Sequence, residues 1–202
     1  MSRGLGDVYK RQVEDQGDAF GDLGVLFILI VILVYIVMAT QFESLLFPFI
    51  IMFTIPFAFT GVFLALWMTS TPLSLIALIG AIMLVGIVTK NGIVMVDYMN
   101  LLVERGSGVF DAVIAGGKSR LRPVLMTSFT TILGMLPLAI GTGAGSETWQ
   151  PMGIAVIGGL TCSTLLTLFI IPALYSVFVN RSQRKEKEKL ARLSAEHQAS
   201  VH

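Results

Sequence analysis

Charged residues are scarce in this chain. Only 13% of its 202 residues are charged and 54% are hydrophobic, whereas an ordinary soluble domain is roughly 25% charged. Residues 23–96 contain two charges, Glu43 and Lys90, and residues 123–180 contain one, Glu147. The net charge of +1 gives no indication of nucleic-acid binding. This composition argues against an ordinary soluble domain and indicates a membrane protein.

Cysteine and histidine are also rare. The single cysteine, Cys162, excludes a disulfide framework and a cysteine-rich metal site. Both histidines, His197 and His202, lie in the polar C-terminal segment. The apolar stretches hold no grouping of His, Cys, Asp and Glu that would bind a metal or activate a nucleophile. We therefore expect no metal and no cofactor, and the sequence disfavours an enzyme.

Five apolar stretches lie between the few charges. They are residues 23–40, 45–68, 73–96, 123–140 and 152–179. Each has at least 18 residues, and a helix needs about 20 to cross the hydrocarbon core. Helices of a soluble core would be shorter and would keep a polar face, and strands of a membrane barrel would alternate in polarity. The sequence predicts an all-α membrane protein with a bundle of five transmembrane helices.

The residues before the first stretch are acidic. Glu14, Asp15, Asp18 and Asp22 precede it, whereas a signal peptide has a basic segment there. We therefore interpret the first stretch as a membrane span.

Proline and glycine positions indicate that the helices pack together. Pro56, Pro137 and Pro172 fall inside spans, where proline kinks a helix and frees carbonyls that neighbouring helices must satisfy. Several glycines are interpreted as points of close helix packing. They are Gly80, Gly86, Gly134, Gly153, Gly158 and Gly159.

Basic residues predict the orientation of the chain. The connection 97–122 and the tail 180–202 are rich in lysine and arginine, whereas the connections 69–72 and 141–151 have none. If all five stretches cross, both basic segments lie on one side, and basic loops are typically cytoplasmic. We expect the N-terminus outside, the C-terminus inside, and residues 13–22 as the outer approach to the first span.

Three segments outside the spans carry local predictions. Residues 109–115 predict a short amphipathic helix that ends at Gly116-Gly117. The glycine-rich run 141–145 is an outer turn, because no strand precedes it and no Lys-Ser/Thr follows, as a phosphate loop requires. The tail predicts a charged cytoplasmic helix in which Glu188 and Arg192 pair at i,i+4. Its basic residues are placed to meet anionic lipid.

Lys90 is the unusual residue of the third stretch. It lies seven residues before Asp97, which is about 10 Å along a helix. Burying the ammonium there costs at least about 2.5 kcal/mol, and intramembrane charges are usually functional. A lysine that faces the bundle interior would pair with a carboxylate, but this sequence has none at that depth. The partner would then come from elsewhere, which suggests an incomplete chain. The alternative is a lysine that extends to the interface without further role.

Hydroxyl groups of the fourth stretch lie at a similar depth. Thr127 is five residues after Arg122, about 7–8 Å from the inner surface, so it could lie near Lys90 across a helix pair. For Ser128, Thr130 and Thr131 we expect hydrogen bonds to carbonyls of their own helix.

Four segments resemble the resistance–nodulation–division (RND) family of efflux permeases. Residues 33–44 (LVYIVMATQFES) resemble the end of the family's eighth span, and residues 86–94 (GIVTKNGIV) its tenth. Residues 120–128 (RLRPVLMTS) and 141–146 (GTGAGS) resemble the two ends of its eleventh. The resemblance runs from about Val13 to about Arg181 and keeps the order and spacing of the segments.

The resemblance implies a proton-driven, drug-type exporter in the inner membrane of Gram-negative bacteria. Such permeases are homotrimers that work with a periplasmic adaptor and an outer-membrane channel. In the family, two aspartates of the fourth span pair with a lysine of the tenth, and a threonine and an arginine of the eleventh complete the proton relay. Those positions fall on Lys90, Thr127 and Arg120, with Arg122 close by. The lysine favours amphiphilic organic substrates over copper or silver ions.

The sequence departs from the family in extent. Seven spans, the aspartate pair and both periplasmic portions are missing, so we expect that the chain cannot pump alone. Residues 1–12 do not resemble the family and are interpreted as a leader of vector or assembly origin. One alternative is a structural or assembly subunit, such as an RND-like component of protein export. A channel would show polar residues along a whole helix face, which these stretches lack.

Overall fold

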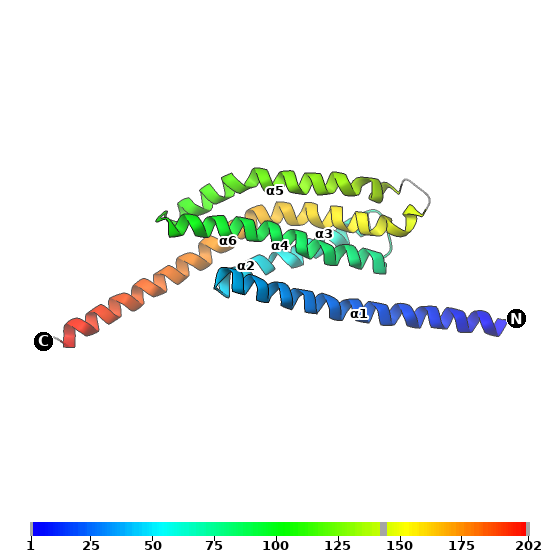
Figure 1. The fold of residues 1–202 in the computed structure, drawn as a ribbon, viewed down its shortest axis with the longest axis horizontal. Coiled ribbons are helices and arrows are strands. Elements are labelled where there is room, and N and C mark those ends of the chain that lie inside the picture. Colours follow the sequence, from blue (N-terminus) through cyan, green and yellow to red (C-terminus); the bar gives the residue numbers. More distant parts are fainter. Residues whose placement is uncertain (1, 142–144, 201–202) are drawn as a thin grey trace.

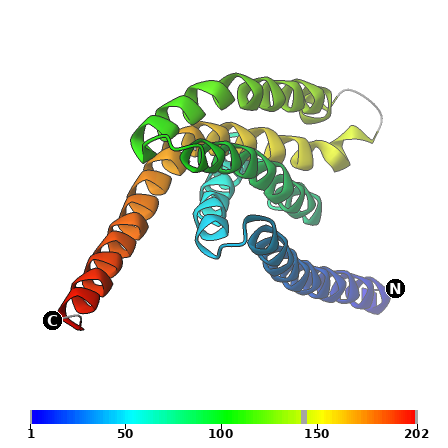
Figure 2. The same ribbon diagram turned by 60° about the vertical axis from the view of Figure 1, so that its left-hand side comes forward.

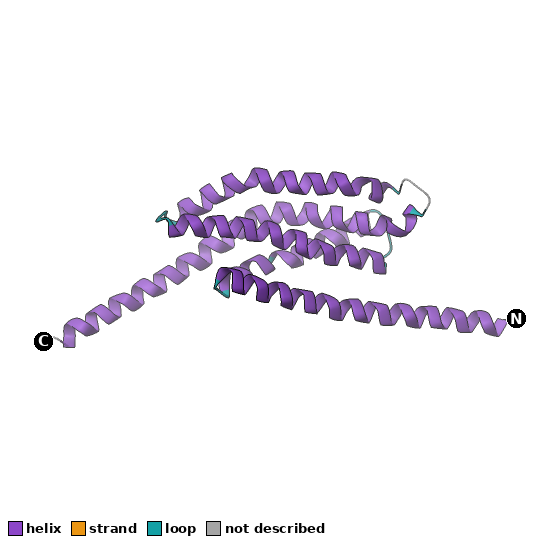
Figure 3. Cartoon of the chain, viewed as in Figure 1, coloured by secondary structure: helices purple, strands orange, loops and turns teal. Residues whose placement is uncertain are grey.

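The computed structural model describes the backbone of residues 2–141 and 145–200 and the side chains of residues 14–141 and 145–179. The described chain is helical, without strands (Figure 3). The helices follow one another as α1 (Ser2–Phe42), α2 (Leu46–Met52), α3 (Thr54–Met68), α4 (Leu75–Glu104), α5 (Val109–Ile140) and α6 (Ser146–Ser200). Long helices run roughly side by side, with the two termini at opposite ends (Figure 1).

Five helical segments are long and apolar enough to cross a membrane. They are Glu14–Phe42, Leu46–Met68, Leu75–Glu104, Val109–Ile140 and Ser146–Val179. Each contains all or nearly all of one predicted stretch, so the prediction of five long apolar helices is confirmed. At several ends the helices continue past the apolar stretches into polar residues, as α5 does between Val109 and Arg122.

The second segment is interrupted at Phe53, which separates α2 from α3. Pro56 lies three residues after the interruption, and its ring removes one backbone donor and crowds the carbonyl of Met52. The Thr54 hydroxyl donates a hydrogen bond of 2.6 Å to the carbonyl of Ile51. The proline thus breaks this span, and a side chain satisfies one of the carbonyls at the break.

The prediction that a short helix ends at Gly116-Gly117 is wrong. α5 runs without interruption from Val109 to Ile140. Gly116 is buried, and a Cβ there would lie 2.6 Å from Cγ of Met99 in α4. Gly116 therefore allows α5 to approach α4 closely, and this packing holds the helix through two residues of low helix propensity.

α6 is the central helix of the bundle and packs against α3, α4 and α5 (Figure 2). Small residues permit the closest approach, which joins α6 to α3. A Cβ on Gly158 would overlap that of Ala65, and a Cβ on Gly61 would lie 2.7 Å from the carbonyl oxygen of Gly158. Packing between small residues is typical of helices in membranes.

The predicted packing glycines divide into two groups. Gly80, Gly153, Gly158 and Gly159 meet neighbouring helices closely, as expected. For Gly86 and Gly134 the prediction is wrong within this chain, because a Cβ at either position would have no atom within 4 Å. Gly61 was not among the predicted packing glycines, but it also meets a neighbouring helix closely.

α1 is the most exposed of the five segments. Its contacts to the bundle concentrate at its C-terminal end, where Met38 is buried in a cluster with Met95 and Met99 of α4. The helix begins at Ser2, so residues 2–12 continue the same helix. At the other end of the chain α6 extends to Ser200. The expected Glu188–Arg192 pair lies outside the residues whose side chains are described.

The glycine-rich connection before α6 is described only at its ends. Gly141 terminates α5 in the left-handed conformation with φ 73°, and Gly145 has φ 84°. Both values suit glycine, which lacks a Cβ. The middle of the predicted turn, residues 142–144, lies outside the described part of the chain.

Candidate functional site

α4 presents Lys90 on the surface of the bundle. The helix begins after Ser74, whose side chain accepts a hydrogen bond of 3.2 Å from the amide of Ala77. Its buried face packs on α6, α5 and α3, while Gly86, Lys90 and Asp97 lie on an exposed face. Among the described residues Lys90 makes no hydrogen bond and no ion pair. The interior that we expected around this lysine is therefore not formed by these helices.

α5 presents Thr127 on a second exposed face. Its hydroxyl donates a hydrogen bond of 2.9 Å to the carbonyl of Pro123, one turn earlier. Thr130 and Thr131 bond in the same way to carbonyls of their own helix, at 2.8 and 2.9 Å. The prediction for these last two threonines is confirmed.

The prediction for Ser128 is wrong. Its hydroxyl lies 2.9 Å from that of Thr164 in α6, and the two form a buried hydrogen bond between helices. Ser128 and Thr164 are 3% and 5% exposed. Ser128 therefore connects two helices, and its neighbour Thr127 bonds within its own helix. The sequence placed both hydroxyls at one depth, but it did not indicate which of them faces α6.

Arg120 is directed toward α4. Its guanidinium carbon lies 4.6 Å from the centroid of the Tyr98 ring, which is within the range of a cation–π contact. The side chain is half-buried, and its Nε is buried without a hydrogen-bond partner among the described atoms. Arg122 and Lys118 are exposed. Of the two neighbouring arginines, Arg120 is thus the one that contacts the adjacent helix.

The contact between Tyr98 and Arg120 shows which levels of α4 and α5 lie beside each other. The two helices are antiparallel neighbours joined by a short turn (Figure 1, green). Lys90 lies eight residues before Tyr98, about 12 Å along α4, and Thr127 lies seven residues after Arg120, about 10.5 Å along α5. Both side chains therefore stand at nearly the same level. No hydrogen bond joins them in the described structure.

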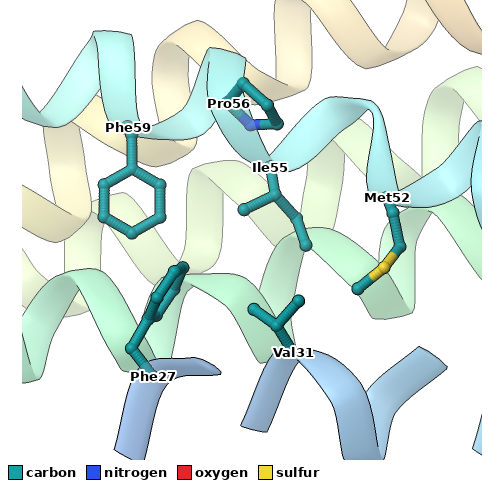
Figure 4. A pocket seen from close by; sticks show the side chains of 6 residues that line it. All are labelled: Phe27, Val31, Met52, Ile55, Pro56 and Phe59. Carbon is teal, nitrogen blue, oxygen red and sulfur yellow. The ribbon is translucent and has the colours of Figure 1, made fainter. Parts of the chain in front are cut away.

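A second surface feature lies on another side of the molecule. Phe27 and Val31 of α1 face Ile55 and Phe59 of α3 across a groove of about 360 Å³, which Met52 and Pro56 also line (Figure 4). The rings of Phe27 and Phe59 meet edge to face at 5.1 Å. All the residues that line this groove are apolar, so it offers no group that could carry a proton. The polar chemistry is concentrated on the exposed faces of α4 and α5.

The part of the chain that the structure describes contains no cluster of three or more His, Cys, Asp or Glu able to hold a metal ion. We call the exposed faces of α4 and α5 that carry Lys90 and Thr127 the α4–α5 surface. Its charged and hydroxyl groups can bind a carboxylate or water through hydrogen bonds and charge. This chemistry suits the movement of protons or ions.

The chain is similar to a known family over most of its length. A model of the AcrB/AcrD/AcrF family matches residues 1–179, a range that includes residues 1–12. The multidrug resistance protein MdtC of Erwinia tasmaniensis is 44% identical over 156 residues, covering 76% of this chain and 15% of that protein. The swarming motility protein SwrC of Bacillus subtilis is 39% identical over 172 residues, covering 85% and 16%.

The chain is also similar to solved structures of efflux pumps. The crystal structure of a heavy metal efflux pump matches with a TM-score of 0.75 and 32% identity, covering 84% of this chain and 16% of the pump. A second crystal form of such a pump matches with a TM-score of 0.71 and 33% identity. The chain spans about 15–16% of the length of MdtC, SwrC and the heavy metal efflux pump.

Proposed function

Because the chain belongs to the AcrB/AcrD/AcrF family of RND efflux permeases, we propose that it forms part of a proton-driven exporter. It would contribute the half of the proton site that carries the lysine. Export, substrates and partners belong to the whole permease. By itself the chain would be inactive, since it contains no carboxylate to receive the proton opposite Lys90.

The exposed α4–α5 surface is the observation that carries this proposal. Lys90 lies one turn after Gly86 on α4, and Thr127 lies two turns before Gly134 on α5. Both glycines have open space where a Cβ would stand. A lysine in an apolar span needs a partner, and glycines on the same faces would let another helix approach closely. The surface thus suits a helix that brings a carboxylate to Lys90.

Proton coupling would follow from the charge of that partner. While the carboxylates are ionised they attract the Lys90 ammonium, and a proton that neutralises them removes the attraction. The helices that carry Lys90 and Thr127 would then shift, and this local change would bias the bundle between two arrangements. Arg120 would complete the relay near the cytoplasmic end. The alternative of a lysine without a role predicts no such coupling.

We further propose that the permease exports amphiphilic organic compounds. This rests on the lysine at position 90 and on the identity to a multidrug resistance protein, 44%, which is higher than the identity to the heavy metal pumps, 32–33%. A susceptibility comparison would test it. Cells that lack the permease should become sensitive to dyes and detergents, whereas sensitivity confined to copper or silver would contradict the proposal.

The proposed setting is a bacterial inner membrane, where the permease acts as a homotrimer. A periplasmic adaptor and an outer-membrane channel would complete the pump in Gram-negative bacteria. The similarity to a Bacillus protein supports the permease unit, rather than the outer-membrane connection, as the element shared with these relatives. Co-purification of the tagged permease with an adaptor would test this assembly.

Substitution of Lys90 in the permease that carries this segment tests the central claim. Lys90→Ala should reduce export at least about tenfold, which corresponds to about 1.4 kcal/mol, at unchanged expression. Lys118→Ala is the matched control, because Lys118 is exposed on α5 outside the apolar stretch, and it should leave export unchanged. A Lys90→Ala permease that exports at the wild-type rate would refute the proposed role.

A further inference from the structure

The side chain of Arg120 is held against α4, and the expected proton relay does not account for what holds it there. Lys118 and Arg122 belong to the same basic segment and are exposed, whereas Arg120 is half-buried against α4. A guanidinium directed into a seam between helices loses water on one side. That loss requires compensation from a neighbouring group.

The face of the Tyr98 ring provides this compensation. The guanidinium carbon lies 4.6 Å from the ring centroid, and an aromatic ring attracts a cation over its face through its quadrupole. The Nε of Arg120 is buried and has no acceptor among the described atoms. Among the described residues, the Tyr98 ring is therefore the main group that contacts the guanidinium.

The backbone of the seam is shaped for this contact. Gly116 lies one turn before Arg120 on α5, and it contacts Met99, the residue after Tyr98. A Cβ added to Gly116 would lie 2.6 Å from Cγ of Met99. A larger residue at position 116 would have to displace the Met99 side chain. The glycine thus leaves room for the Met99 side chain beside Tyr98 in this seam.

We propose that Tyr98 is a positioning residue that holds the Arg120 guanidinium at the cytoplasmic end of the α4–α5 surface. This inference rests on the proposed function. The Nε of Arg120 is turned into the seam and one face of its guanidinium lies on the Tyr98 ring, so the orientation of the terminal N–H groups is fixed. These N–H groups can then bind water or a carboxylate from one direction only. They lie at the cytoplasmic end of the α4–α5 surface, which leads to Lys90 and Thr127.

The contact itself can be tested on the full 202-residue chain in lipid nanodiscs with nitrogen-15-labelled arginine. The Arg120 Nε–H resonance, assigned through Arg120→Lys, should be shifted upfield by the ring and should exchange slowly with water. Tyr98→Phe should keep both properties because it keeps the ring face, and Tyr98→Leu should lose both. An Arg120 resonance unaffected by Tyr98→Leu would overturn the inference.

The role is tested in the permease that carries this segment. Tyr98→Leu should lower the turnover number about tenfold with KM unchanged, as expected when a cation–π contact of this kind is lost. Tyr98→Phe should export like the wild type. Arg120→Gln combined with Tyr98→Leu should be no worse than Arg120→Gln alone, and Arg122→Gln is the matched control that should remain active. Equal losses for Tyr98→Phe and Tyr98→Leu would overturn the positioning role.

Two further measurements keep the outcomes separate. If Tyr98→Leu does not accumulate in the membrane, Tyr98→Met replaces it with a flexible apolar side chain, and the same losses are expected. Lys90→Ala is measured in parallel. If Lys90→Ala abolishes export and Tyr98→Leu does not affect it, the proposed function stands and the positioning role is overturned. If Lys90→Ala exports normally, the proposed function fails, and the role of Tyr98 in it fails as well.

Discussion

At the scale of single residues, glycine separates the packed surfaces of this bundle from its open ones. Gly61 lies where α3 meets α6, and Gly134 lies on an open face of α5. Both are glycines inside long apolar helices, so their sequence contexts are alike. The difference between them is visible only when the neighbouring helix is in place.

Substitution of these two glycines should have opposite consequences. Gly61→Ala would place a methyl group against Cβ of Cys162 and 2.7 Å from the carbonyl oxygen of Gly158, so we expect it to destabilise the bundle by about 1–3 kcal/mol. Gly134→Ala meets open space and raises helix propensity, so it should not destabilise the chain. Unfolding in mixed detergent micelles, followed by circular dichroism, measures both. Equal stability of the two variants would contradict the packing described here.

Residue-level predictions from the sequence succeeded where depth alone decides the outcome. Thr130 and Thr131 bond to their own helix because an isolated hydroxyl in an apolar span has that option at any orientation. Ser128 depended on the direction of its side chain. A direction follows from helix packing, which the sequence of a largely apolar stretch does not indicate.

At the scale of helices, the Ser128–Thr164 hydrogen bond connects α5 to α6. The bond is buried, with 2.9 Å between the two oxygens. A double-mutant cycle with Ser128→Ala and Thr164→Val should give a coupling of about 0.6 kcal/mol, the average for such bonds in membrane helices. Stability would be measured by the same micelle unfolding.

A matched cycle provides the control for this helix contact. Thr127→Val removes a hydroxyl that bonds within α5, so its combination with Thr164→Val should be additive. If both cycles gave the same coupling, the effect would not come from the bond between Ser128 and Thr164.

Helix boundaries were harder to predict than helix number. The sequence predicts a kink at Pro56, and the structure has a one-residue interruption at Phe53 between α2 and α3. Gly116-Gly117 was expected to end a helix, yet α5 continues through it. In both cases local propensity competes with packing. The proline removes a hydrogen bond that packing does not replace, whereas Gly116 gains a close contact with Met99 that offsets its low propensity.

At the scale of the whole molecule, the open α4–α5 surface is unlike the lipid-facing surface of the other helices. α1 exposes large apolar side chains such as Leu29 and Leu33, which suit lipid. The α4–α5 surface also exposes apolar side chains such as Met126 and Leu133, but it adds Lys90, Thr127 and Gly134. Charge and small residues are unfavourable toward hydrocarbon and favourable toward another helix. The sequence indicated the charge and its depth, but the face could be identified only from the assembled helices.

The orientation of the molecule is the remaining prediction at this scale, and it rests on the two turns that flank α4. Ser70 lies in the exposed turn before α4, and Ser107 lies in the exposed turn after it. Basic residues gather on the Ser107 side, so that side should be cytoplasmic. Because α4 has 30 residues, about 45 Å at 1.5 Å per residue, it is long enough to place the two turns on opposite sides of a membrane.

A cysteine-labelling experiment can test that arrangement, since the chain has one cysteine to remove. In a Cys162→Ala background, a maleimide that does not cross membranes should label Ser70→Cys in intact spheroplasts. It should label Ser107→Cys only after the membrane is permeabilised. The reverse pattern would invert the topology and place Arg120 on the outer side, against the proposed relay. Labelling of both positions in intact spheroplasts would mean that α4 does not cross, and then Lys90 would not be a charge within the membrane at all.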